Sequence, residues 1–154
     1  MKPPKIICCG NPWCGDDAAG LEAGARLRAL GIEVETIERD AFTLLELWNG
    51  ADEVLLIDAV VSGAEPGAIT VLDVTQADAR IPPQSCSTHR MGVAEALAIG
   101  RNLGRLPRRI VLYGIEAGSL DTVRRGSPDL SPAVARAVEQ VAAEIASSVR
   151  ERLG

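Results

Sequence analysis

Short apolar runs alternate along the chain with segments in which apolar residues recur at helical spacing. Strands are predicted where four or more apolar residues follow one another or alternate with polar ones, at 5–9, 32–37, 53–61, 68–74 and 109–116. Helices are predicted where the apolar period lengthens, at 16–30, 43–48, 89–103 and 131–153. The alternation of the two patterns predicts an α/β protein.

Glycine and proline residues mark the ends of these elements. Gly31 and Gly104 are placed to terminate helices, Thr88 to cap the helix at 89–103, and Pro132 to open the last helix. In the helix at 89–103 the face formed by Ala94, Leu97 and Ala98 is expected to be the apolar one. The turn at Ser62-Gly63 and Pro66-Gly67 favours pairing of the strand at 68–74 with the strand before it.

The pattern predicts one domain over residues 1–154, with a twisted, mostly parallel five-stranded sheet and helices packed on both faces. Glu53 to Val61 is a near-continuous apolar run and is expected to be a central strand, with Asp58 at its end. Ligands of such sheets bind at the carboxyl ends of the strands. Three segments are expected there: Gly10 to Gly20, Asp58, and Ser85 to His89.

Composition narrows the function classes. The chain has 154 residues, of which 47% are hydrophobic, and its net charge is −5, so a nucleic-acid partner is disfavoured. No apolar run approaches the length of a membrane span and no signal peptide is recognisable, which predicts a cytoplasmic protein without membrane contact. In that reducing compartment the four cysteines are expected to be thiols, with Cys8 and Cys9 in the core.

The segment Gly10 to Gly20 is the densest chemical signal. Its glycines lack the spacing of a dinucleotide-binding loop, and Asp16 follows Gly15 where a phosphate loop would have Lys, so nucleotide binding is disfavoured. Asp16 and Asp17 could both serve as helix caps, or one of them could face a site.

An acidic residue and the single histidine complete a possible ligand set. Asp58 follows four apolar residues, and a buried carboxylate there would need a partner, although a loop-capping role is the alternative. His89 is the only imidazole, and a structural role is the alternative for it. Two Asp and one His could hold zinc, nickel or manganese, leaving positions open for water.

Other side chains allow further interpretations. Cys86 and His89 could form a nucleophile and base, although no third orienting group is evident. Trp13, Phe42 and Trp48 could form an apolar surface for a protein partner near the site, with core packing as an equal alternative.

Taken together, these segments resemble the hydrogenase maturation endopeptidases, which remove a C-terminal extension from the large subunit of nickel-iron hydrogenases. The resemblance covers most of the chain. It lies in Gly10-Asn11, Gly15-Asp16-Asp17, Gly20, Ile57-Asp58-Ala59, Ser87-Thr88-His89, Gly92, Glu95, Pro107 and Gly114-Ile115-Glu116. The sequence departs from the family pattern at Ala18, Ala117, Trp13 and Cys14, a difference that concerns the particular hydrogenase partner more than the reaction.

The resemblance implies a twisted sheet between helices and a peptide hydrolase that acts on a hydrogenase large-subunit precursor. It implies that Asp17, Asp58 and His89 contact the metal and form the catalytic site, with Asp16 supporting them. It further implies that the metal is nickel already carried by the substrate. We expect a monomer or weak homo-oligomer. A non-catalytic nickel-site docking module or metallochaperone, and a hydrolase carrying its own zinc, are the alternative functions.

Overall fold

A computed structural model describes residues 3–11, 15–38, 40–76, 79–82, 92–118 and 130–153 of the chain. The strands are β1 (Lys5–Cys9), β2 (Glu35–Ile37), β3 (Glu53–Val60), β4 (Ile69–Asp73) and β5 (Arg109–Glu116). The helices are the 3-10 turn η1 (Gly15–Ala18), α1 (Ala19–Ala29), α2 (Ala41–Trp48), α3 (Val93–Leu103) and α4 (Pro132–Leu153).

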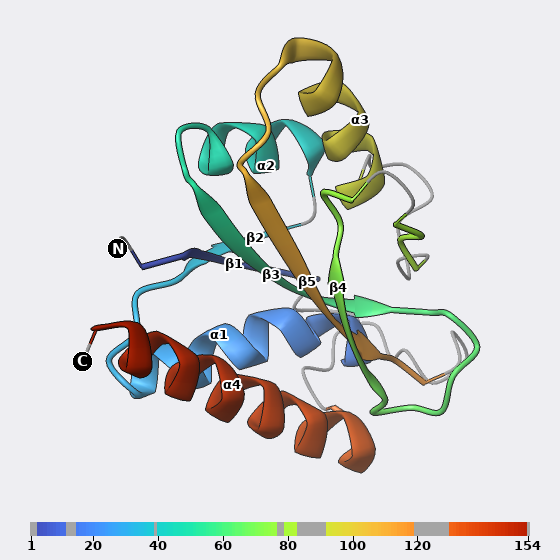
Figure 1. Cartoon of the computed structure of the whole chain (residues 1–154). Helices are drawn as coiled ribbons and strands as arrows, with labels where there is room; N and C mark the ends of the chain where they lie inside the picture. Colours follow the sequence, from blue (N-terminus) through green and yellow to red (C-terminus); the bar gives the residue numbers. More distant parts are fainter. Residues whose placement is uncertain are drawn as a thin grey trace.

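The strands form one five-stranded sheet in the order β2-β1-β3-β5-β4. The first four strands of that order run parallel, and β4 pairs antiparallel with β5 at the edge. Helices α2 and α3 lie on one face of the sheet, and α1 and α4 lie on the other (Figure 1). The predicted α/β architecture, with a mostly parallel five-stranded sheet between helices, is therefore confirmed.

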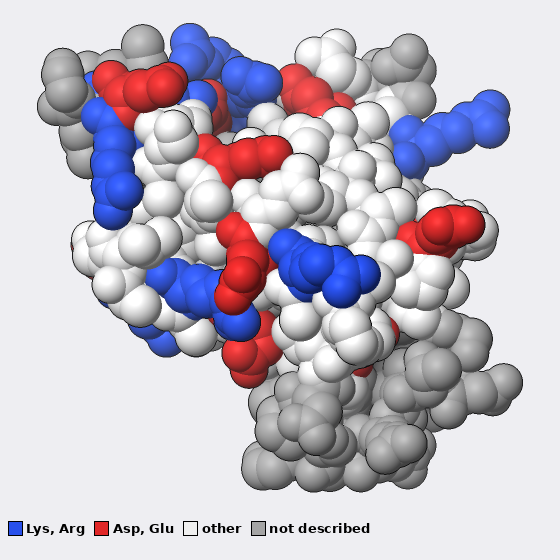
Figure 2. Space-filling model, turned by 90° about the horizontal axis from the view of Figure 1, so that it is seen from below, with Lys and Arg blue, Asp and Glu red and all other residues white. Residues whose placement is uncertain are grey.

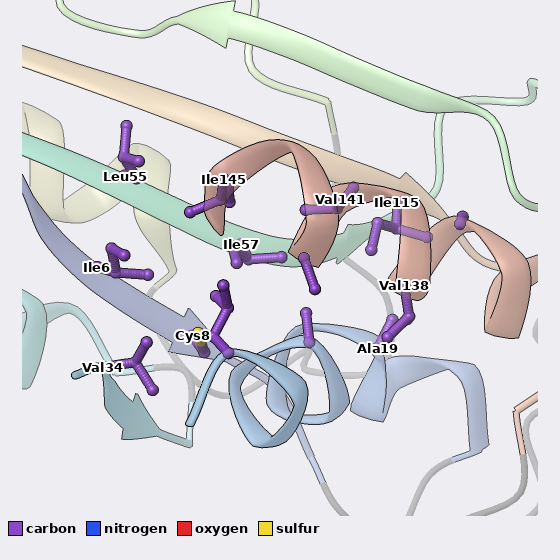
Figure 3. Packing of buried hydrophobic residues seen from close by; sticks show 14 of the residues in the cluster. Ile6, Cys8, Ala19, Val34, Leu55, Ile57, Ile115, Val138, Val141 and Ile145 are labelled. Atoms are coloured by element: carbon purple, nitrogen blue, oxygen red, sulfur yellow. The ribbon is translucent and has the colours of Figure 1, made fainter. Parts of the chain in front are cut away.

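Two hydrophobic cores lie on the two faces of the sheet, because successive side chains of a strand point to opposite sides. Ile6 and Cys8 of β1 point toward α1 and α4, as Figure 3 shows, whereas Ile7 and Cys9 belong to the core under α2 and α3. The central strand β3 is buried on both sides, as its apolar run predicts.

Helix ends follow the local signals. Gly31, at φ +82°, donates its N–H to the carbonyl of Arg28, and Ile32 donates to Leu27, which closes α1 with a Schellman motif. Gly104, at φ +66°, ends α3 in the same left-handed conformation. At the start of α2, Asp40 caps the helix by accepting a hydrogen bond from the Phe42 N–H at 3.1 Å.

Several predictions about single elements are wrong. The strand at 69–73 pairs with β5 and not with β3. This is because β5 occupies the edge of β3, and the chain that leaves β3 forms its next strand, β4, on the far side of β5. In α3 the buried residues are Val93, Ala96, Leu97 and Gly100, while Ala94 and Ala98 are exposed. Alanine has so little apolar surface that its burial cannot be assigned from the pattern alone.

Some boundaries also move. The predicted helix at 16–30 begins as the 3-10 turn η1, the strand at 32–37 is regular only from Glu35, and α2 begins at Ala41, two residues before Thr43. The proposed cap Thr88 lies outside the described residues, and α3 begins after Gly92. Among the described helices, none is long and apolar enough to cross a membrane.

Candidate active site

The strand order changes direction between β1 and β3. Along the chain β1 is followed by β2, which lies on one side of it, and β3 is followed by β4 and then β5, which both lie on the other side. Ligands of open α/β sheets bind at the carboxyl ends of the strands where the strand order reverses in this way. Asp58 is carried by β3, and the segment from Gly10 to Gly20 follows β1.

Two glycines allow the segment after β1 to lie directly on the strands. A Cβ atom on Gly20 would stand 2.2 Å from the Cys9 carbonyl oxygen and 2.4 Å from that of Ile57. A Cβ atom on Gly10 would stand 2.5 Å from the carbonyl oxygen of Asp17. Only glycine permits these approaches, so α1 and the η1 turn are brought against the ends of β1 and β3.

Asp17 lies in η1 and its side chain is only 1% exposed. The backbone carbonyl of Asp17 accepts a hydrogen bond from the N–H of Asn11 at 3.2 Å, which folds the loop back on itself. The η1 turn packs against β3, the strand that bears Asp58. The structure therefore brings together the two elements that carry the predicted acidic site residues.

Asp58 is completely buried within β3. The strand continues to Val60, so Asp58 precedes the end of the strand by two residues and the prediction that it ends the strand is wrong. Its neighbours Ile57 and Ala59 face α1 and α4, which places the Asp58 side chain on the face covered by α2 and α3. Its Oδ1 atom accepts a hydrogen bond from the Ala59 N–H at 2.8 Å.

Asp16 ties the loop to two distant segments. Its Oδ2 atom accepts hydrogen bonds from the N–H of Gly118 at 3.1 Å and the hydroxyl of Ser131 at 2.9 Å, and its Oδ1 from the N–H of Ser131 at 2.7 Å. These donors lie just after β5 and just before α4. Asp16 thereby fixes the η1 turn, which also carries Asp17. The three donors compensate for the burial of the Asp16 charge.

Glu116 is a second buried carboxylate with a structural partner, and its role was not foreseen from the sequence. At the end of β5 it accepts hydrogen bonds from the N–H and the hydroxyl of Ser62, with the N–H at 2.8 Å from Oε2. It thereby holds the connection between β3 and β4. The signal was present, because Glu116, like Asp58, comes after a run of apolar residues within its strand.

His89 lies outside the described residues, as do Trp13, Cys14 and Cys86, so the predicted three-ligand set and the Cys86/His89 pair stay predictions. Within the described part of the chain, no three His, Cys, Asp or Glu side chains are grouped as a metal site would require. The buried acidic side chains of the described residues are Asp16, Asp17, Asp58 and Glu116. Asp16 and Glu116 anchor loops, and Asp17 and Asp58 are the candidates for chemistry.

The cysteines of β1 are buried, and the two aromatic residues of α2 differ in exposure. Cys8 and Cys9 are buried free thiols, as expected, and burial raises the pKa of Cys8 to about 12. Trp48 is fully buried in the core under α2 and α3, so it is not part of a surface, whereas Phe42 is 59% exposed.

Comparison with known proteins agrees with this architecture. The family model described as hydrogenase maturation protease matches residues 39–148. Hydrogenase 2 maturation protease of Escherichia coli strain K12 is 29% identical over 149 residues, which cover 93% of this chain and 90% of that protein.

Solved structures show the same fold. The NiFe hydrogenase maturation protease HybD from Thermococcus kodakarensis superposes with a TM-score of 0.69 at 30% identity, covering 96% of this chain and 98% of that one. The maturating endopeptidase HybD from Escherichia coli superposes with a TM-score of 0.70 at 22% identity, covering 98% and 94%. The chain therefore belongs to the hydrogenase maturation protease family and is a peptide hydrolase.

Proposed function

We propose that this protein removes the C-terminal extension of a nickel-loaded hydrogenase large-subunit precursor, and that it does so in the cytoplasm. Asp17, Asp58 and His89 contact the nickel, which the substrate brings with it. The observation that carries the proposal is the burial of Asp17 and Asp58 on two contacting elements near the carboxyl ends of β1 and β3. Carboxylate and imidazole groups are suitable ligands for such an ion.

The two carboxylates suit recognition of a cation more than structural support. Asp16 and Glu116 have backbone and hydroxyl donors from distant loops, which accounts for their burial. Asp17 and Asp58 are as deeply buried, and they lie on a turn and a strand that contact each other near the carboxyl ends of β1 and β3. Burial of negative charge is costly, and a divalent cation bound by both carboxylates would offset that cost.

The proposed reaction is hydrolysis of one peptide bond. A water oxygen forms a bond to the scissile carbonyl carbon, the C–N bond breaks, and the proton from the water passes to the departing amine. Asp17 or Asp58 accepts the proton from the water during attack, and the metal of the substrate polarises the reacting groups.

The test is cleavage of purified precursor, followed by mass spectrometry of the large subunit. The wild-type protein is expected to shorten nickel-loaded precursor and to leave nickel-free precursor intact. Asp17→Asn, Asp58→Asn and His89→Ala are each expected to lower kcat/KM at least about a hundredfold, because each removes a ligand or base. Asp52→Asn is the matched control, since Asp52 is exposed at the opposite end of β3.

Several outcomes would contradict the proposal. Equal cleavage of both precursors would show that nickel is not recognised, and full activity of the Asp17 and His89 variants would remove the ligand set. Metal-dependent binding without any shortening would indicate a docking module. Stoichiometric zinc in the purified protein, with cleavage of unrelated peptides, would indicate a hydrolase carrying its own metal.

A further inference from the structure

The last three residues of β3, which include Asp58, depend on β5 for their position. The register of β1 with β3 ends at Ile57, whereas the register of β5 with β3 continues to the pair formed by Val60 and Glu116. Beyond that pair, the N–H of Ala117 donates to the carbonyl of Val60 at 3.0 Å. Within the described residues, the end of β3 therefore has β5 as its one strand partner, and whatever fixes the end of β5 also fixes Asp58.

Glu116 ties the end of β5 to two neighbouring segments. Its N–H donates to the carbonyl of Ala68, and its carbonyl accepts from the N–H of Gly67, both at 2.8 Å. Its carboxylate accepts from the N–H of Ser62 at 2.8 Å and from the Ser62 hydroxyl. Ser62 stands two residues beyond the end of β3. The buried Glu116 side chain therefore links β5 to the chain that has just left β3.

Two residues after Glu116, the same segment reaches the η1 turn. The N–H of Gly118 donates to Oδ2 of Asp16 at 3.1 Å, and Asp16 precedes Asp17 in η1. We give the name β5 clamp to Glu116, Ala117 and Gly118. The β5 clamp is hydrogen-bonded on one side to the chain that follows Asp58, and on the other side to the turn that carries Asp17.

The contacts of the Glu116 carboxylate indicate a role in geometry. Asp58 pairs with Gly114, and Glu116 lies two residues after Gly114, so the side chains of Asp58 and Glu116 are on the same face of the sheet. Both oxygens of Glu116 are engaged by Ser62, Oε1 by the hydroxyl and Oε2 by the N–H. Glu116 is thus placed beside the candidate site with its oxygens directed to a loop.

We propose that Glu116 is a positioning residue, which acts through the β5 clamp to set the separation between the carboxylates of Asp17 and Asp58. This inference rests on the proposed function, which assigns both carboxylates to the nickel of the substrate. Distances from ligand atoms to a metal vary by only about 0.2 Å, so two ligands on different elements can share one ion only if those elements keep a fixed spacing. Glu116 itself contacts neither the ion nor the scissile bond.

Three substitutions at Glu116 separate the reach of the side chain from its charge. Glu116→Asp keeps the charge but is one methylene shorter, Glu116→Gln keeps the length and an acceptor oxygen but loses the charge, and Glu116→Ala loses all of these. The assay is cleavage of nickel-loaded precursor at saturating concentration. Glu116→Ala and Glu116→Asp are expected to lower kcat about tenfold, because a misplaced group slows catalysis, and Glu116→Gln is expected to stay within about twofold of the wild type.

Asp73→Ala is the matched control for the loss of a loop contact. Oδ1 of Asp73 accepts hydrogen bonds from the N–H of Thr75 at 3.0 Å and from the Thr75 hydroxyl, the same two donor types that Ser62 offers to Glu116. Asp73 pairs with Val111, so it lies toward the opposite end of β5 from the clamp. This variant is expected to have the kcat of the wild type.

Glu151→Gln is the control for the loss of one negative charge. Glu151 is exposed on α4, and acidic and basic side chains are interspersed on the face that carries this helix, as Figure 2 shows. Its kcat is expected to match that of the wild type. Thermal unfolding of every variant gives a temperature at which all of them are folded, and kcat is compared at that temperature, so a loss of stability alone leaves kcat unchanged.

Two results would overturn the positioning role. Wild-type kcat in Glu116→Ala and Glu116→Asp would show that the clamp supports only the fold. A loss in Glu116→Gln as large as that in Glu116→Ala would show that the charge of Glu116 takes part in the reaction. If Glu116→Ala does not fold, the comparison of Glu116→Asp with Glu116→Gln gives the same decision.

The failures of the two proposals can be told apart. If the wild type does not shorten the nickel-loaded precursor, the proposed function fails. If the wild type shortens it and Glu116→Asp retains the full kcat, the positioning role of Glu116 alone is overturned.

Discussion

At the scale of single residues, neighbouring carboxylates have different surroundings. Asp16 and Asp17 are adjacent in one 3-10 turn and both are buried, yet Asp16 accepts three hydrogen bonds from Gly118 and Ser131. The local sequence is consistent with either of them as a cap, because it contains no information about donors more than a hundred residues away. The resemblance to a known family assigned Asp16 a supporting role, and its contacts agree with that role.

Asp16→Asn tests this role by its effect on stability. An amide keeps the shape but turns a donor toward backbone N–H groups that need an acceptor, so we expect the free energy of unfolding to fall by about 2 to 3 kcal/mol. Ser131→Ala removes only the hydroxyl donor and should cost about 1 kcal/mol. Urea unfolding of both variants is the measurement. A smaller effect of Asp16→Asn than of Ser131→Ala would contradict the assignment.

At the scale of elements, the strands at 5–9 and 109–116 were predicted at their observed boundaries. Both are apolar runs bounded by clear breaks, and burial on both faces selects such runs. The partner of β4 was predicted wrongly, since pairing in a sheet depends on strands that lie far apart in the sequence. The close approach of α1 to β1 and β3 was likewise not predictable, although Gly20, which permits it, was recognised in the glycine segment.

Gly20→Ala tests the approach of the helix to the strands. The added methyl group would meet two backbone carbonyl oxygens, so α1 must shift and we expect a loss of about 3 kcal/mol of stability. Gly24→Ala lies on the same helix and gains the same helix propensity, but its Cβ would stand 3.0 Å from the Cys8 sulfur and 3.1 Å from the Cys8 Cβ, contacts that a small shift relieves. Its cost should be no more than about 1 kcal/mol, as measured by thermal or urea unfolding. Equal effects of the two substitutions would show that backbone contact is not decisive.

At the scale of the whole molecule, the sheet and its two cores remove ionisable groups from water. Burial raises the pKa of Cys8 to about 12, and the negative charge of Asp58 adds to this while Arg28 opposes it. Above its ordinary pKa the thiol ionises in the unfolded chain but stays protonated in the folded protein. Stability is therefore retained below about pH 9 and lost as the pH rises toward 12.

Cys8→Ala provides the test of this linkage. Between pH 9 and 11 the wild type is expected to lose about 1.4 kcal/mol of unfolding free energy per pH unit more than the variant does. Urea unfolding at a series of pH values measures the difference in slope, which is independent of the constant cost of the cavity in Cys8→Ala. Parallel slopes for the two proteins would mean that the thiol titrates as freely in the folded state as in the unfolded one.

The sequence by itself determined the order of strands and helices. It also determined that acidic residues lie in the segment after β1 and in the segment that forms β3. These features depend on local periodicity, on glycine and proline, and on the cost of burying a charge, all of which are encoded over a few residues. The tertiary structure alone decided that η1 packs on β3, that Asp16 and Glu116 anchor loops, and that Trp48 is buried while Phe42 is exposed. Each of these depends on contacts between segments distant in sequence, and only the packing of the sheet and helices sets which residues meet.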